Sequence, residues 1–306
     1  MYEVIILGGG PAGLTAAIYC GRQQLKTLLL IKNIGGQTAL SHCIQNFPGF
    51  LEVSGLILSQ KMLEQVKALS SVEIKIAVEA VKISALAEGY QLTLADQTNF
   101  LAKTVIIAAG KNSRQLNAVG EKEFYGKGVT YCATCDGPLF KNKPVAVVGG
   151  GNSGLAAALQ LAAYCPQVYL IEALPDLRGE RVRQEQVLNS PNIQVLTGAK
   201  VQEIIGDRIV QGIVVEHEQQ TKTLAVNGVF VEIGYVPATE WLQGIVELND
   251  KGEIKINEKN ATSVPGIFAA GDITDTPYKQ TVIAAGEGAK AAMSATELVL
   301  GKTTAW

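Results

Sequence analysis

One short unit occurs twice in this chain, and it limits the available folds more than any other feature. Residues 4–7 read VIIL and run directly into GGGPAG, while residues 145–148 read VAVV and run directly into GGGNSG. An alanine-rich stretch follows each copy and leads to another apolar segment, at residues 27–31 and 167–172. A strand, a glycine-rich turn, a helix and a second strand form a βαβ unit, so the sequence predicts an α/β protein with two Rossmann-like domains.

Both copies have the spacing G-x-G-x-x-G, which is the fingerprint of dinucleotide-binding folds. The first glycine permits a tight turn, the second lets the backbone approach a pyrophosphate, and the third lets the helix pack closely on the strand. The N-terminus of that helix then offers free N–H groups to the phosphates. The candidate ligand-binding residues are Gly8, Gly10 and Gly13 in the first copy and Gly149, Gly151, Asn152, Ser153 and Gly154 in the second.

The two copies differ where an acid ordinarily holds the adenosine ribose, about 20 residues beyond the fingerprint. That position is Ile31 in the first copy and Glu172 in the second. A carboxylate accepts a hydrogen bond from a free 2′-hydroxyl group and repels a 2′-phosphate. The second site therefore favours an unphosphorylated dinucleotide, while the first must hold its ribose in another way.

Further apolar strands that end in glycine indicate how the two domains are arranged along the chain. They are VIIAAG at 105–110, VFVEIG at 229–234 and GIFAAGD at 266–272. Asp272 follows the last of them at the carboxyl end of a strand, where open α/β sheets bind ligands; the alternative is a turn residue. The order predicts nested domains, with residues 1–114 and 245–306 forming the first domain and residues 115–244 forming the second.

The chain has five cysteines, of which Cys132 and Cys135 form the single C-x-x-C pair. An odd count at irregular spacing does not fit the disulfide framework of a secreted protein. A structural zinc site would need a second close pair of ligands, so we expect no metal. Redox chemistry is therefore the leading interpretation of the pair, against two incidental cysteines in a turn.

Composition and charge exclude several other classes of function. The net charge is −2 and there is no basic run, which argues against a nucleic-acid partner. No apolar run approaches the ~18 residues of a membrane span, and the N-terminal segment lacks the basic region of a signal peptide. We therefore expect no membrane association and a cytoplasmic location.

The motifs around the cysteine pair resemble those of thioredoxin reductases of the small, bacterial type. They are CATCDG at 132–137, GGQ at 35–37, NFPG at 46–49 and AAGD at 269–272, together with the two fingerprints. CDGPLF at 135–140 and GEGAK at 286–290 also resemble the alkyl hydroperoxide reductase flavoprotein, although we expect no counterpart here of its N-terminal thioredoxin-like module. The resemblance covers essentially the whole chain. It implies the class II pyridine nucleotide-disulfide oxidoreductase fold, FAD in the first domain, a nicotinamide dinucleotide in the second, and a homodimer.

The resemblance also implies roles for individual residues, carried over by matching motif. Cys135 would face the flavin, Cys132 would attack the disulfide of a thioredoxin-like partner, and Asp136 would protonate the departing thiolate unless it is merely a turn residue. A rotation between the domains would alternate flavin reduction with exposure of the dithiol, about hinges near residues 112–118 and 243–244. The FAD contacts would be Gly10, Ala12, Gly13, Gly36, Gln37, Asn46, Gly271, Asp272 and Gln280.

The electron donor is the point at which the sequence departs from the family pattern. NADPH-dependent members carry arginines where this chain reads EALPDLR at 172–178, so NADPH is disfavoured. NADH is compatible with Glu172. Both related families, however, carry a glutamate where this chain has Ala156, and the loss of that acid weakens the case for a positioned nicotinamide. The alternative interpretation of Ala156 is that it simply packs its helix on the sheet. Trp306 resembles the C-terminal aromatic of ferredoxin-dependent flavin thioredoxin reductases, which would stack on the flavin and imply ferredoxin as donor; the alternative is a frayed tail. A second FAD in the Glu172 site is a third option.

Together these features favour an enzyme that passes electrons from FAD through Cys135 and Cys132 to a thioredoxin-like protein disulfide. One alternative is a redox-sensing flavoprotein that reports on a partner without turnover. Another is a flavin enzyme of oxygen or peroxide chemistry that makes no use of the cysteines. Turnover with a thioredoxin separates the first hypothesis from the second, and substitution of the cysteines separates it from the third.

Overall fold

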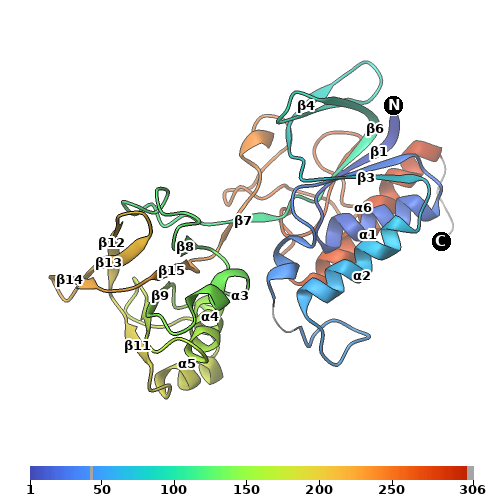
Figure 1. Ribbon diagram of the computed structural model, residues 1–306. Helices are drawn as coiled ribbons and strands as arrows, with labels where there is room; N and C mark the ends of the chain where they lie inside the picture. The colour runs from blue at the N-terminus through green and yellow to red at the C-terminus, as the bar shows by residue number, and fades with distance from the viewer. Residues whose placement is uncertain (42–43, 302–306) are drawn as a thin grey trace. The chain divides into compact units, whose positions relative to one another are not determined.

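The computed structural model of the protein describes residues 1–41 and 44–301 (Figure 1). The chain forms two compact units: unit 1 contains residues 1–112 together with the chain from Pro237 onward, and unit 2 contains residues 113–236. Each unit is built on a parallel or mainly parallel sheet with helices, and the predicted α/β fold class is confirmed.

The sheet of unit 1 has the strand order β3-β2-β1-β6-β5-β4, and β17 also pairs with β6. Its parallel strands are β1 (Tyr2–Leu7), β2 (Thr27–Ile31), β3 (Val72–Ile76), β6 (Asn99–Ile107) and β17 (Ile267–Ala269). The antiparallel strands β5 (Tyr90–Leu94) and β4 (Ala80–Ala85) extend it at one edge. Because β1 lies between β2 and β6, the first fingerprint begins in the interior of the sheet.

Three helices of unit 1 lie side by side in Figure 1 against this sheet: α1 (Pro11–Arg22), α2 (Gly55–Lys67) and α6 (Thr281–Leu300). Two short 3-10 helices, η1 (Gly36–Leu40) and η3 (Glu240–Leu242), belong to the same unit. The continuous apolar sequence of β1 follows from burial on both faces. Val4 and Ile6 pack into the core on the helical side, and the intervening side chains pack into the core on the opposite face.

Unit 2 contains a parallel sheet of order β11-β10-β9-β15-β8. Its strands are β8 (Val129–Thr130), β9 (Val145–Val148), β10 (Val168–Ile171), β11 (Ile193–Leu196) and β15 (Gly228–Val231). Its helices are α3 (Ala133–Asp136), η2 (Gly137–Phe140), α4 (Asn152–Ala162) and α5 (Arg181–Leu188). A separate antiparallel sheet is formed by β12 (Lys200–Gly206), β13 (Val210–His217) and β14 (Gln220–Leu224). The second fingerprint follows β9, which is the central strand of the parallel sheet.

Two short strands carry the chain between the units: β7 (Lys111–Ser113) on the way out and β16 (Tyr235–Pro237) on the way back, and they pair with each other. The chain re-enters unit 1 at Pro237, whereas the sequence placed the return at residue 245. The difference arises because Leu242 is fully buried in a core cluster of unit 1, with Trp241 packed against it. The apolar residues after β16 therefore belong to the first unit. No helix within the described residues is both long and apolar enough to span a membrane.

We predict that Gly154→Ala destabilises unit 2. A Cβ atom at Gly154 would lie 1.7 Å from the backbone oxygen of Gly149, so the helix and the strand would have to separate. Overpacking of this kind costs about 1–3 kcal/mol in the free energy of unfolding. Calorimetric unfolding of the purified protein measures the loss.

The matched control is Gly151→Ala in the same turn. Gly151 has a φ of −83°, and among the described residues no atom lies within 4 Å of a Cβ built there. Its unfolding temperature should equal that of the unmodified protein. Equal unfolding temperatures for both variants would contradict the close approach of Gly154 to Gly149.

Candidate functional site

The cysteine pair lies at the carboxyl end of a strand in unit 2. Cys132 and Cys135 form a disulfide, with their Cα atoms 5.3 Å apart. Cys132 is the N-cap of α3, the single turn that follows β8, and its Sγ accepts a hydrogen bond from the backbone N–H of Cys135 at 3.0 Å. An N–H group directed at sulfur favours the thiolate when the disulfide opens. The turn thus provides local support for negative charge on Cys132.

Asp136 lies in the same turn and is held there by Thr130. The Thr130 hydroxyl group donates a hydrogen bond to the Asp136 carboxylate and accepts one from the backbone N–H of Cys132 at 3.2 Å. The short chain of hydrogen bonds connects the acid to the backbone of the first cysteine. The structure therefore brings together all three residues that the resemblance assigned to catalysis, and their chemical roles stay proposals.

Glu232 is a further acid at this place that the sequence analysis did not single out. It follows β15, and the backbone N–H of Ala133, between the two cysteines, favours its charged form and so opposes the rise of its pKa. Burial raises the pKa of Glu232 to about 7. A signal was present in the sequence, because the segment VFVEIG places a charged residue at the end of an otherwise apolar strand.

Tyr131 fixes the other side of the cysteine turn. Its hydroxyl group donates a hydrogen bond to Glu121 at 2.8 Å. Glu121 is almost fully buried and also accepts the backbone N–H groups of Leu116 and Asn117, at 2.7 and 2.6 Å. These bonds tie the strand that leads into Cys132 to the segment through which the chain enters unit 2.

The first fingerprint of unit 1 has the geometry that a dinucleotide requires. A Cβ atom at Gly13 would lie 1.9 Å from the backbone oxygen of Gly8, so only glycine lets α1 approach the strand this closely. Gly8 itself has a φ of +124°, which favours glycine. Within the described residues no side chain caps the N-terminus of α1, and its first N–H groups face the carboxyl edge of the sheet.

The remaining candidate FAD contacts gather at this same edge of unit 1. Gly36, beyond β2, lies against Gly10, and Gly271, beyond β17, lies against Ala12. Two hydrogen bonds join the other candidates: Gln37 Nε2 donates to the Lys111 carbonyl at 2.8 Å, and Asn46 Nδ2 donates to Gln280 Oε1 at 3.0 Å. Segments that are far apart in sequence are thus brought to one edge of the sheet, as expected if this unit holds FAD.

Asp272 is the acid of that edge. Burial raises its pKa, and the positive charges of Lys279 and Lys111 oppose the shift. Both lysines also form ion pairs with Glu253, with Nζ–Oε1 distances of 3.3 and 3.1 Å. A carboxyl group at the end of a strand and close to a mixed set of charges can bind a ligand hydroxyl group, which is the role predicted for Asp272.

Glu172 lies against the second fingerprint, as its predicted role requires. Its two carboxylate oxygens accept the backbone N–H groups of Gly150 at 2.6 Å and Leu174 at 2.9 Å. Arg178 forms an ion pair with it at 3.9 Å. A carboxylate has about four acceptor positions, so it can still accept a ribose hydroxyl group. The arginine that follows the strand is paired with this acid and does not form a fork for a 2′-phosphate.

The structure also describes three other residues of the second site and its helix. Asn152 Oδ1 accepts the backbone N–H of Glu180 at 2.8 Å, so this side chain holds the loop after β10 rather than facing an open site. Ser153 is exposed. Ala156 is also exposed on α4, which contradicts the alternative that its side chain packs the helix on the sheet.

One predicted contact falls on a residue that the structure does not describe. Trp306 lies beyond the described residues, so its stacking on a flavin stays a prediction. Within the described residues no group of three or more histidine, cysteine, aspartate or glutamate side chains is arranged to hold a metal ion.

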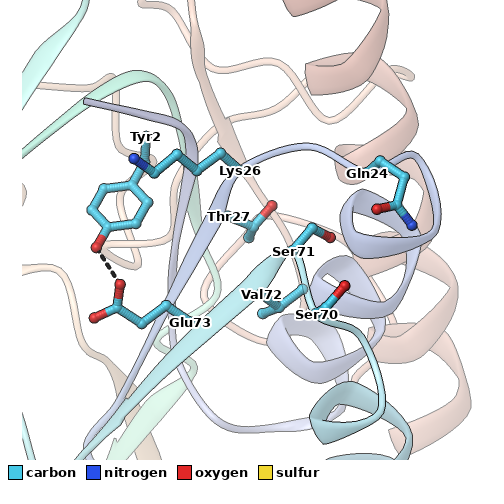
Figure 2. A pocket seen from close by; sticks show the side chains of 8 residues that line it. All are labelled: Tyr2, Gln24, Lys26, Thr27, Ser70, Ser71, Val72 and Glu73. Carbon is cyan, nitrogen blue, oxygen red and sulfur yellow. Dashed lines mark hydrogen bonds between the residues drawn. The ribbon is translucent and has the colours of Figure 1, made fainter.

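A cavity of about 280 Å³ lies in unit 1 at the amino-terminal ends of β1, β2 and β3 (Figure 2). Figure 2 shows the Tyr2 hydroxyl group directed at Glu73, to which it donates a hydrogen bond at 2.5 Å. The Lys26 ammonium group lies 5.4 Å from the centre of the Tyr2 ring. These polar groups are paired with one another at the edge opposite to the ligand-binding edge of a parallel sheet. The cavity is therefore separate from the candidate sites.

The hydrogen bonds of Thr130 generate a prediction for the cysteine pair. Thr130→Val keeps the shape of the side chain but removes the donor to Asp136 and the acceptor for the Cys132 N–H. We expect the disulfide to react with dithiothreitol about three- to tenfold more slowly, because the two lost hydrogen bonds together cost about 0.6–1.4 kcal/mol net. Peptide mass spectrometry after alkylation measures the rate, and Thr130→Ser, which retains the hydroxyl group, is the control. Unchanged rates in both variants would show that Thr130 does not support the turn.

Comparison with known proteins agrees with this geometry. The sequence model of the family described as "Pyridine nucleotide-disulphide oxidoreductase" matches residues 2–288. One of the alkyl hydroperoxide reductase proteins of Staphylococcus epidermidis is 44% identical over 98% of this chain and 59% of its own length. A Bacillus subtilis protein named NADH dehydrogenase is 41% identical, with the same two coverages. The chain thus spans about three fifths of the length of the curated relatives it matches.

Solved structures give the same result. Thioredoxin reductase of Lactococcus lactis, in its FR conformation, has a TM-score of 0.90 at 33% identity and covers 98% of this chain and 100% of its own. A ferredoxin-flavin thioredoxin reductase of Clostridium acetobutylicum has a TM-score of 0.54 at 30% identity, with coverages of 98% and 99%. The resemblance stated from the motifs is confirmed. The chain belongs to the pyridine nucleotide-disulphide oxidoreductase family.

Proposed function

We propose that this chain is a flavin-dependent disulfide reductase that transfers electrons from NADH to a thioredoxin-like protein disulfide. The observation that carries the proposal is the Cys132–Cys135 disulfide, which shares one hydrogen-bonded turn with Asp136 at the carboxyl end of a dinucleotide-type sheet. A structural disulfide would not need an acid held beside it. A disulfide that is opened and closed in each cycle needs a nearby group that exchanges protons with the sulfur atoms.

The residues of unit 1 fit FAD. The uncapped N-terminus of α1 suits a pyrophosphate, and Asp272 suits a ligand hydroxyl group. Gln37, Asn46 and Gln280 would line the rest of the same edge. When bound, FAD supplies the two-electron chemistry that joins a dinucleotide donor to a disulfide.

The second fingerprint and Glu172 support NADH as the donor. The carboxylate of Glu172 is nearly fully buried against Gly150, so a 2′-phosphate at this position would meet a fixed negative charge. The pairing of Arg178 with Glu172 leaves that arginine engaged. The name of the Bacillus subtilis relative refers to NADH as well.

The chemical balance of the proposed cycle is simple. A hydride from NADH carries two electrons and one proton, which convert the disulfide into one thiol group and the thiolate of Cys132 while NADH becomes NAD⁺. Cys132 then attacks the disulfide of the partner, and the mixed disulfide is resolved by Cys135 as the partner leaves with two thiol groups. Asp136 protonates the departing thiolate of the partner. The homodimer and the cytoplasmic location stay predictions.

We predict that NADH reduces the flavin of the purified protein at concentrations at least about tenfold lower than NADPH, because Glu172 repels the 2′-phosphate. Anaerobic stopped-flow absorbance of the flavin measures this, with photoreduced ferredoxin as a third donor and the ratio of bound cofactors determined on the same preparation. Steady-state reduction of a thioredoxin then tests turnover.

Each other outcome has a defined meaning. Rapid reduction by low NADPH would overturn the argument from Glu172. Reduction by ferredoxin alone would overturn NADH as the donor, and two molecules of FAD per chain would assign the second site to another dinucleotide. Flavin reduction without thioredoxin turnover would favour a redox-sensing protein.

A further inference from the structure

Glu232 is placed beside the cysteine turn by the register of two neighbouring strands. β15 runs parallel to β8, with Val229 opposite Val129 and Phe230 opposite Thr130. Two residues beyond these partners the two strands lead to Glu232 and Cys132 respectively. Because the carboxyl ends of parallel strands meet at one edge of a sheet, the acid and the cysteine emerge next to each other.

The position of Glu232 is fixed from both sides. On one side its carboxylate is close enough to the redox turn for the backbone N–H of Ala133, a buried residue inside the ring that the disulfide closes, to favour its charged form. On the other side its own backbone N–H donates to Val148 at 2.7 Å, and a Cβ atom at Gly149 would lie 2.3 Å from its backbone oxygen. Glu232 therefore lies between the redox turn and the second fingerprint.

The surroundings of Glu232 hold little positive charge. Among the described residues it forms no ion pair within 4.0 Å, and no neighbouring positive charge contributes to the shift of its pKa. The turn of α3 contributes Asp136 and the two cysteines, the fingerprint at 149–154 contributes no charged residue, and the segment after β15 contributes Tyr235. The pKa of Tyr235 is raised, by burial and also by the charge of Glu232.

We propose that Glu232 takes up a proton when the Cys132–Cys135 disulfide is reduced and releases it when the disulfide forms again. Glu232 is then a positioning residue that couples the charge of the redox turn to pH. The inference rests on the proposed function only in treating the cysteine pair as a redox group. It does not depend on the donor or on the partner.

The step balances in electrons and protons. Two electrons from a dithiol or from reduced flavin break the S–S bond, one sulfur takes a proton, and the Cys132 sulfur remains a thiolate supported by the N–H of Cys135. The new negative charge raises the proton affinity of the nearby carboxylate, which takes a proton from solvent. When Cys132 attacks the disulfide of a partner its negative charge leaves with the partner's thiolate, and Glu232 loses the proton.

The direction of the pH dependence follows from the raised pKa of about 7 in the disulfide form. Below that value Glu232 is neutral in both redox states and behaves like a glutamine. Above it the carboxylate is charged while the disulfide is intact, and it opposes a thiolate. Reduction of the pair should therefore become less favourable as pH rises through the neutral range.

The test is a redox titration of the purified, flavin-loaded protein with oxidised and reduced dithiothreitol, from about pH 6 to about pH 9. Peptide mass spectrometry after alkylation reports the state of Cys132 and Cys135 directly. The comparison is between the wild-type protein and Glu232→Gln. Glu216→Gln removes an exposed carboxylate from β13 of the same unit and serves as the matched control.

We expect the ratio of the wild-type to the E232Q equilibrium constant for reduction to be near one at low pH. It should fall about tenfold by high pH, which corresponds to a change of about one unit in the proton affinity of Glu232. E216Q should follow the wild-type protein throughout. Parallel curves for wild type and E232Q across the whole range would overturn the proposal.

A second measurement covers the case in which E232Q does not fold. The infrared difference spectrum of the wild-type protein, thiol-reduced minus disulfide, should gain a protonated carboxyl band at about pH 7.5. Glu232→Asp, which retains the acid, should keep that band if it folds. Absence of the band in the wild-type protein would overturn the proposal. Because neither measurement uses NADH or thioredoxin, failure of the proposed function and failure of this inference are distinguishable.

Discussion

The close contact between the first and third glycines of each fingerprint is the constraint on which the two candidate sites depend. In unit 1 a Cβ at Gly13 would lie 1.9 Å from Gly8, and in unit 2 a Cβ at Gly154 would lie 1.7 Å from Gly149. Without a side chain at the third position, the helix can pack directly on the end of its strand. Its uncapped N-terminus then lies at the carboxyl edge of the sheet, where it can meet a phosphate. Gly271, Asp272, Cys132 and Glu172 stand at or beyond the carboxyl ends of strands in the same two sheets.

The side chains at this edge carry different charges in the two units. In unit 1 the acid Asp272 is accompanied by Lys111 and Lys279, and both lysines are paired with Glu253. In unit 2 the redox turn is bordered by the acids Asp136 and Glu232 and by neutral backbone donors. A site with balanced charge suits a cofactor that stays bound. An acidic site suits a disulfide whose reduction must be accompanied by protons.

The two dinucleotide-type folds, the redox pair and the acid of the second site could be predicted from the sequence, because the patterns that indicate them are local. The fingerprints, the C-x-x-C pair and the acid at residue 172 lie within short segments whose geometry their spacing determines. Glu232 was missed because its proximity to Cys132 comes from the pairing of β15 with β8, between segments far apart in the chain. The point of return to unit 1 was placed too late because the burial of Leu242 is a tertiary contact. Ala156 shows the same limit, since helical propensity says nothing about which face is exposed.

The central claim is that electrons pass from the flavin to the Cys132–Cys135 pair, and an anaerobic dithionite titration tests it most directly. The flavin and the disulfide each accept two electrons, so the wild-type protein should take up about four electron equivalents per FAD. Replacement of both cysteines by serine should reduce the uptake to about two equivalents while the flavin spectrum is retained. Uptake of about two equivalents by the wild-type protein would contradict the account, because the disulfide would then not exchange electrons with the flavin.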